Sequence, residues 1–153
     1  DGRDVIPYVI AGIMQKIPDI TLFLNPCHNS YDRLGGNKAP GYISWSSENR
    51  SQLIRIPAAE GEYRRAELRS PDSTANPYLA FAALIYAGLH GIEWELPLPE
   101  PADVNLHTAP PEVLEQYQKL PTTLASAQCM MVFSEFVQEH FPKELISAYC
   151  SQV

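Results

Sequence analysis

The chain has 153 residues, of which 45% are hydrophobic and 19% are charged, and its formal net charge is −7. These values are typical of one folded globular domain and exclude a wholly disordered chain. The acidic balance argues against a general affinity for nucleic acid or for an anionic membrane surface.

The first predicted element is an amphipathic helix over residues 4–17, where apolar side chains recur at helical spacing. Pro18 is expected to end it, because proline lacks the amide hydrogen that a helix interior requires. A short apolar run over residues 21–24 and a turn at Asn25 and Pro26 follow. Residues 34–40 contain Gly35, Gly36 and Asn37 in series and predict a mobile loop.

Three strands are predicted next, over residues 41–46, 52–57 and 64–70. The connections between them are short, which favours antiparallel pairing. In the third strand, the period of two places Ala66 and Leu68 on the core face and the charged residues on the other face.

Asn76 and Pro77 predict the start of an apolar helix, with asparagine as the N-cap and proline at the first helical position. Gly88 and Gly91 are expected to close it. The helix is apolar nearly all round, so we expect it to be buried. It is too short to span a bilayer, and no other run is long enough, so we expect no membrane segment.

The remainder of the chain predicts a proline-rich linker followed by short helices. The expected fold is α+β, with an antiparallel sheet packed by helices and followed by a helical tail. The expected segments are 1–92, 93–111 and 112–153, and the expected helices of the tail are 112–119, 123–130, 132–140 and 143–150.

The arginines are concentrated in one quarter of the chain. Residues 33–69 carry seven cations and four anions, a local net charge of 7 − 4 = +3, and contain six of the seven arginines. Arginine is suited to bidentate capture of carboxylate or phosphate, so this quarter predicts a site for a compact anionic ligand.

The alternation of Arg65, Glu67 and Arg69 allows two interpretations. One is a solvated ladder of salt bridges, which would contribute little stability. The other is a site for a polyphosphate and a divalent metal, because Glu67 alone cannot neutralise these arginines together with Arg33, Arg50 and Arg55. The number of neighbouring arginines favours the second.

Other kinds of site are not indicated. The three cysteines have no CxxC spacing, and the simplest interpretation is reduced thiols in the cytoplasm. The four histidines lack zinc-binding spacings, and no glycine-rich phosphate loop is present. Ser30, Ser51 and Cys27 have no recognisable paired base, which argues against a nucleophilic hydrolase.

Four segments, in unbroken order, resemble the C-terminal half of the catalytic domain of glutamine synthetases. The resemblance runs from about residue 9 to residue 92 and is weaker beyond. The segments are NPCHNSYDRLG (25–35), NRSQLIRIP (49–57), RRAELRSPD (64–72) and ANPYLAFAALIYAGLHGI (75–92).

The resemblance implies part of a catalytic half-barrel and an ATP-dependent ligation of glutamate and ammonium through a γ-glutamyl phosphate. It also implies a homo-oligomeric parent protein that uses Mg or Mn. By match to the family motifs, Arg33 and Arg69 would bind glutamate, and Arg50, Arg55 and Arg65 would contact ATP and its phosphates. Arg50 and Arg69 would act in catalysis, and Glu67 would bind a metal ion.

Two departures from the family pattern leave alternatives open. Lys38 stands in the flap loop where the family usually has a glutamate, which allows a γ-glutamyl ligase that uses another amine. The family's N-terminal domain and earlier metal-binding motifs are absent from the sequence. We therefore expect a piece of a larger enzyme that is inactive alone; the alternative is an inactive domain that binds anions.

Overall fold

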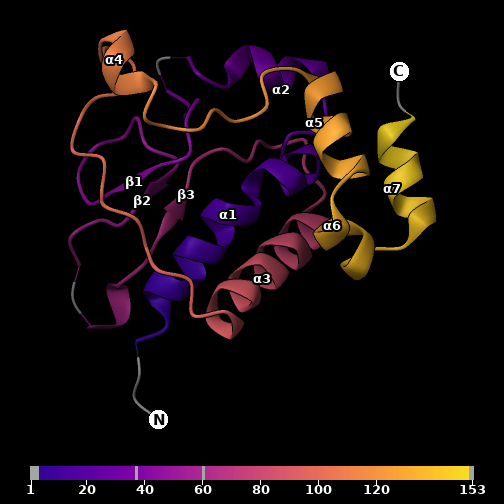
Figure 1. Ribbon diagram of the computed structural model, residues 1–153, viewed down its shortest axis with the longest axis horizontal. Helices are drawn as coiled ribbons and strands as arrows, with labels where there is room; N and C mark the ends of the chain where they lie inside the picture. The colour runs from indigo at the N-terminus through magenta and orange to yellow at the C-terminus, as the bar shows by residue number, and fades with distance from the viewer. Residues whose placement is uncertain (1–3, 37, 60, 152–153) are drawn as a thin grey trace.

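A computed structural model describes residues 4–36, 38–59 and 61–151. Within these residues it contains seven α-helices, one 3₁₀ turn (Gly61–Tyr63) and a sheet of three short strands, which confirms an α+β fold. Figure 1 shows the sheet on one side of the long helices α1 and α3 and the helices α5, α6 and α7 on the other. No described helix is both long enough and apolar enough to cross a bilayer.

Helix α1 spans Ile6–Leu24 and continues through Pro18, so the prediction that Pro18 ends the helix is wrong. An interior proline costs about 3 kcal/mol. The residues after it bury several large side chains, including Ile20, Phe23 and Leu24, each fully shielded from solvent. Each such side chain contributes roughly 1.5–3 kcal/mol, so burial outweighs the proline.

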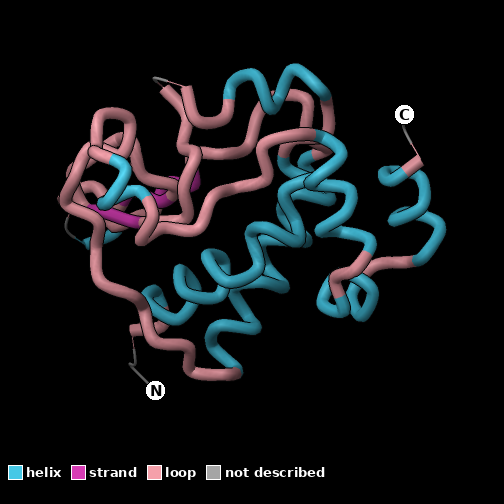
Figure 2. Tube along the Cα trace, turned by 45° about the horizontal axis from the view of Figure 1, so that its top comes forward, coloured by secondary structure: helices cyan, strands magenta, loops and turns pink. Residues whose placement is uncertain are grey.

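Helix α3 spans Pro77–Glu93 and packs along α1 (Figures 1 and 2). Its predicted start is confirmed, because the Asn76 side chain accepts hydrogen bonds from the amides of Tyr78 and Leu79. The predicted closure at Gly88 and Gly91 is wrong. A Cβ on Gly91 would lie 1.9 Å from the carbonyl oxygen of Tyr8, so this glycine permits close packing of the two helices and does not end α3.

The prediction that α3 is buried all round is also wrong. One face carries large apolar side chains that remain exposed, with Tyr78 at 85% and Phe81 at 64% of their full accessible surface. The opposite face, with Ala80, Ala83 and Ala87, packs into the core. Helix α3 therefore has two apolar faces, and the described part of the chain covers only one of them.

The sheet consists of β1 (Trp45–Ser46), β2 (Ile54–Arg55) and β3 (Glu67–Leu68), in that order. Strands β2 and β3 are antiparallel, as predicted, but β1 and β2 are parallel. The strands are also shorter than predicted, and Ala66 is exposed rather than in the core.

Buried polar contacts lie beside the parallel pair of β1 and β2. The Gln52 amide nitrogen donates to the carbonyl oxygens of Ala102 and Val104, at 3.0 and 2.8 Å, and its amide oxygen accepts from the Ser44 hydroxyl. These bonds satisfy a fully buried side chain without a hairpin turn. They connect the segment before β2 to the segment before β1 and to residues 102–104.

Four further helices form the tail, and they differ from the predicted ones mainly in length. Helix α7 (Lys143–Cys150) begins and ends as predicted, whereas α4 (Pro111–Leu114) is a single turn. Helix α5 (Leu124–Val132) begins at the Thr123 cap, and α6 (Glu135–His140) begins at the Ser134 cap. Apolar side chains of α5, α6 and α7 join the same core cluster as α1, and they include Leu124, Met131, Phe136, Val137 and Ile146.

Residues 94–110 contain no helix or strand, in agreement with the predicted linker, and they pack against the sheet. The Ala102 amide donates to the Trp45 carbonyl oxygen at 2.8 Å, and the Trp45 indole donates to the Pro99 carbonyl oxygen at 2.7 Å. The boundaries of the three predicted segments remain a prediction. Cys27, Cys129 and Cys150 form no disulfide in the described part of the chain.

Candidate active site

Glu67 lies between two arginines on one face of the sheet. The register of β2 and β3 places Arg55 directly opposite Glu67. An Nη atom of Arg55 lies 3.1 Å from Oε2 of Glu67, and an Nη atom of Arg65 lies 3.2 Å from Oε1. Desolvation alone would raise the pKa of Glu67, but the hydrogen bonds and charges of Arg55 and Arg65 lower it. This carboxylate therefore stays ionised and has a guanidinium at each oxygen.

Arg69 follows β3 and extends the same charged face. Its backbone amide donates to the Leu53 carbonyl oxygen at 2.9 Å, which extends the pairing of β3 with the segment that precedes β2. Desolvation by partial burial lowers the pKa of Arg69. Three neighbouring guanidinium groups lower it further, those of Arg50, Arg55 and Arg33, while Glu67 opposes them. Repulsion of this kind requires the arginines to lie close together.

Arg33 is the last residue of α2 (His28–Arg33), a helix that the sequence did not predict. Its guanidinium donates to the carbonyl oxygens of Ser70 and Arg69, at 2.8 and 3.1 Å. These bonds tie α2 to the segment after β3. They place Arg33 beside Arg69 at the edge of the cluster.

Asn25 supports the segment after β3 through hydrogen bonds. The sequence indicated this residue only as part of a turn. It is fully buried after α1, and its amide nitrogen donates to the Ser70 carbonyl oxygen at 2.8 Å and to Asp72 at 3.3 Å. The Tyr31 hydroxyl donates to the Asn25 carbonyl oxygen at 2.8 Å. Burial raises the pKa of Tyr31, so it remains a donor. A polar residue directly after an apolar helix is the signal that could have identified this position.

Lys38 lies in the loop beside the cluster. Its backbone carbonyl oxygen accepts a hydrogen bond from Arg69 at 3.3 Å, while its side chain is exposed. The Gly35 amide donates to the Pro40 carbonyl oxygen at 3.1 Å and closes the loop, and Gly35 adopts a φ of 82° that favours glycine. Asn37, which the sequence placed in this loop, lies outside the described residues.

The five arginines that the sequence singled out therefore lie in one charged neighbourhood, which also contains Glu67. Counting five guanidinium groups against Glu67 gives 5 − 1 = +4. Nε of Arg55 and one Nη of Arg69 are buried and have no hydrogen-bond partner within the described residues. Buried donors of this kind, in a positive environment, can bind a carboxylate or a phosphate.

Arg64 stands apart from the cluster although it is adjacent to Arg65 in the sequence. Its guanidinium pairs with the carboxylate of Asp4 at 3.4 Å, and both side chains are more than half exposed. A pair of this kind contributes little stability. Arg64 is therefore a natural control for variants of the clustered arginines.

The described residues do not by themselves form a metal-binding cage. No three side chains of histidine, cysteine, aspartate or glutamate gather among them. Both oxygens of Glu67 are paired with arginines. Glu67 can contribute at most one ligand side chain to a divalent ion whose other ligands come from elsewhere.

Known proteins of one family resemble this chain over most of its length. The family described as "Glutamine synthetase, catalytic domain" matches residues 2–152, well beyond the resemblance seen in the sequence. The chain is 46% identical over 145 residues to a protein of Methanosarcina mazei named glutamine synthetase, covering 93% of this chain and 32% of that protein. Proteins of the same name from Methanocaldococcus jannaschii and Staphylococcus aureus are 40% and 43% identical, over 92% and 84% of this chain and 32% and 30% of theirs. The chain thus spans about a third of the length of the curated relatives that it matches.

Proposed function

The chain belongs to the glutamine synthetase family, and from that premise we propose that it forms part of an ATP-dependent enzyme that joins glutamate and ammonium into glutamine. In this reaction an oxygen of the glutamate γ-carboxylate attacks the γ-phosphorus of ATP, and ADP leaves. The ammonia nitrogen then attacks the carbonyl carbon of the γ-glutamyl phosphate, and phosphate leaves with the former carboxylate oxygen. Both steps move negative charge among phosphate and carboxylate oxygens.

The residues of the cluster fit this chemistry through positioning and charge. Arg69 and Arg33 would hold the glutamate, and Arg50, Arg55 and Arg65 would hold the ATP phosphates. Guanidinium groups fixed in advance need no reorganisation when charge develops on the transferring phosphoryl group. A bound Mg or Mn would neutralise phosphate charge, with Glu67 as one ligand and the others from parts of the longer protein outside this chain.

The observation that carries the proposal is the excess of positive charge around Arg69 and Arg55, each with a buried donor that lacks a partner among the described residues. A solvated salt-bridge ladder would leave neither an excess of four charges nor buried unpaired donors. An anionic ligand satisfies both at once.

The test is glutamate- and ammonium-dependent phosphate release from ATP by the full-length protein that carries this chain. Arg69→Lys keeps the charge but loses the planar fork, so kcat/KM should fall by about 100-fold. Arg64→Lys makes the same change outside the cluster and should retain the wild-type rate. Wild-type turnover of Arg69→Lys would remove Arg69 from the reaction.

Lys38 favours a second candidate within the same chemistry, a γ-glutamyl ligase that uses another amine. Because the Lys38 carbonyl oxygen accepts a hydrogen bond from Arg69, this exposed residue lies next to the cluster. A cation there repels ammonium. Lys38→Glu should lower the KM for ammonium; an unchanged KM would show that Lys38 does not set the choice of amine.

We also propose that the chain does not turn over alone, because it spans about a third of its relatives and gathers no metal cage within the described residues. The full-length protein would be a cytoplasmic homo-oligomer. Binding of ATP without any turnover by the full-length protein would instead favour an inactive domain that binds anions.

A further inference from the structure

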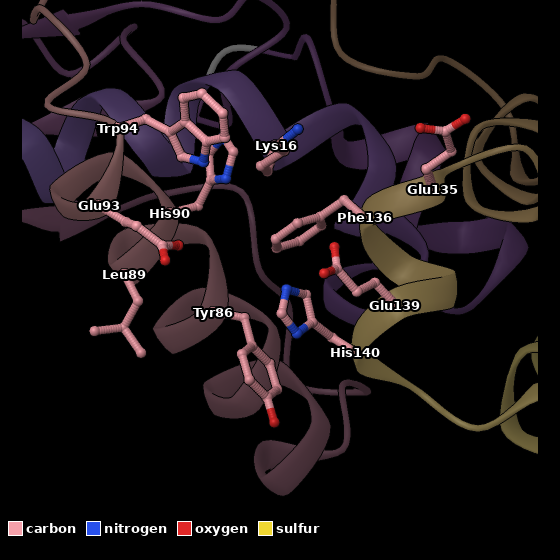
Figure 3. A pocket seen from close by; sticks show the side chains of 10 residues that line it. All are labelled: Lys16, Tyr86, Leu89, His90, Glu93, Trp94, Glu135, Phe136, Glu139 and His140. Atoms are coloured by element: carbon pink, nitrogen blue, oxygen red, sulfur yellow. The ribbon is translucent and has the colours of Figure 1, made fainter.

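A second site lies away from the arginine cluster, in a cavity of about 720 Å³ between α1, α3 and α6. None of the clustered arginines lines it. Figure 3 shows its walls, which consist of aromatic rings and carboxylates with a single lysine and one aliphatic side chain, Leu89. This composition is opposite in charge to that of the arginine cluster.

Five aromatic rings form a continuous arc around the cavity. Tyr86 stacks on His140 with ring centroids 4.2 Å apart, and Phe136 meets His140 edge-on at 4.9 Å. His90 lies 6.0 Å from both Phe136 and Trp94, which completes the arc. Arcs of aromatic rings attract cations through the negative potential of the ring faces.

Carboxylates make the same cavity negative. Glu93 and Glu139 point into it from α3 and α6, as Figure 3 shows, and Glu135 stands at its edge. Against these three carboxylates stands the ammonium of Lys16, which leaves 1 − 3 = −2. Desolvation and the charge of Lys16 lower the pKa of His90, so His90 is neutral at pH 7 and does not offset the carboxylates.

Lys16 makes a cation–π contact in this cavity. Its ammonium nitrogen lies 5.2 Å from the centroid of the Phe136 ring, within the range of a cation–π contact. It leaves the carboxylates of Glu93 and Glu139 without an ion pair among the described residues. A second cation can therefore enter between them.

From this arrangement we propose that the cavity binds a small organic cation, of the size of an alkylammonium ion, between the Glu93 and Glu139 carboxylates and against the rings of Tyr86, Trp94 and His140. The proposal is independent of the ligase reaction, because it uses no residue of the arginine cluster.

The test is a titration of the 153-residue chain with tetramethylammonium chloride, followed through the ring signals of histidine and tryptophan by NMR. The signals of His90, His140 and Trp94 should shift saturably, with a dissociation constant of about 1 mM. His28, His107 and Trp45 do not line the cavity, so their signals should stay fixed and report any general salt effect in the same sample. Sodium chloride and the uncharged tert-butyl alcohol, which is similar in size, should not produce the shifts.

Substitutions in the cavity distinguish specific binding of the cation there from nonspecific attraction of a cation to an acidic protein. Glu139→Gln and Glu93→Gln should each weaken binding by about threefold, whereas Glu144→Gln on α7 removes the same charge elsewhere and should leave it unchanged. Lys16→Met should strengthen binding by about threefold, because it frees a ring face and removes the competing charge. Equal responses to tert-butyl alcohol, equal weakening by Glu144→Gln, or no saturable shift of the cavity signals would each overturn the proposal.

Discussion

The contact between α1 and α3 at Gly91 allows a sharp test of how closely the two helices pack. A Cβ at Gly91 would lie 1.9 Å from the Tyr8 carbonyl oxygen and 2.8 Å from the Cα of Gly12. These neighbours are backbone atoms, so no rotation of a side chain can make room. Gly91→Ala must therefore push the helices apart.

The size of the effect follows from the distances. To reach even 3.0 Å from the Tyr8 oxygen, the backbones must separate by about 1 Å. A gap of that size loses a quarter to a half of the dispersion energy of the contacts along the interface. Alanine in a helix gains only about 1 kcal/mol over glycine. We therefore expect Gly91→Ala to lower the free energy of unfolding by about 3 kcal/mol.

Gly88→Ala is the matched control on the same helix. Its Cβ would meet a methyl group of Val9 at 3.1 Å, and that side chain can move aside. The helix-propensity gain should then offset the small displacement, with a change of about 0 to 1 kcal/mol in the stabilising direction. Urea unfolding followed by far-ultraviolet circular dichroism measures both variants. A Gly91→Ala variant as stable as Gly88→Ala would refute the close approach of the two helices.

Three further predictions concern the arginine cluster and its support. Glu67→Gln removes the internal counterion, so metal-free pyrophosphate should bind about fivefold more tightly by calorimetry; weaker binding would show that Glu67 does not compete with the ligand. Partial burial would raise the pKa of Asp72, but the hydrogen bonds that its carboxylate accepts lower this pKa. The ionised carboxylate therefore stabilises the folded state above the ordinary pKa of aspartate, and this stabilisation is lost as the pH falls. Asp72→Asn should therefore cost about 1 kcal/mol at pH 7 and progressively less as the pH falls below the ordinary pKa of aspartate, by urea unfolding, and a loss independent of pH would contradict this. Asn25→Ala should cost about 2 kcal/mol through the lost bond to the Ser70 carbonyl, and a neutral result would mean that Asn25 does not support the cluster.

Features set by neighbouring residues could be predicted from the sequence. The start of α3 depends only on Asn76 and Pro77, and the structure confirms both. The gathering of the arginines could also be predicted, because repulsion among so many cations implies a shared counterion. The role of each arginine in the reaction remains a proposal.

Features set by distant contacts could not be predicted. Pro18 carries a local stop signal, but the burial of the residues after it is decided by helices far along the chain. Beside the parallel strands β1 and β2, the buried Gln52 side chain bonds to residues about fifty positions away, which no local sequence pattern specifies. The exposed face of α3 could not be foreseen, because composition does not reveal which apolar face has a covering partner.

The most direct test of the account is an isotope transfer in the full-length protein. Glutamate carrying ¹⁸O in both γ-carboxylate oxygens is incubated with ATP and ammonium, and the released phosphate is analysed by mass spectrometry. If the carboxylate attacks ATP and phosphate then leaves from the γ-glutamyl phosphate, each phosphate should contain one ¹⁸O atom, and the other should remain in the glutamine amide. Unlabelled phosphate would mean that water, not glutamate, receives the phosphoryl group, and would contradict the proposed ligase reaction.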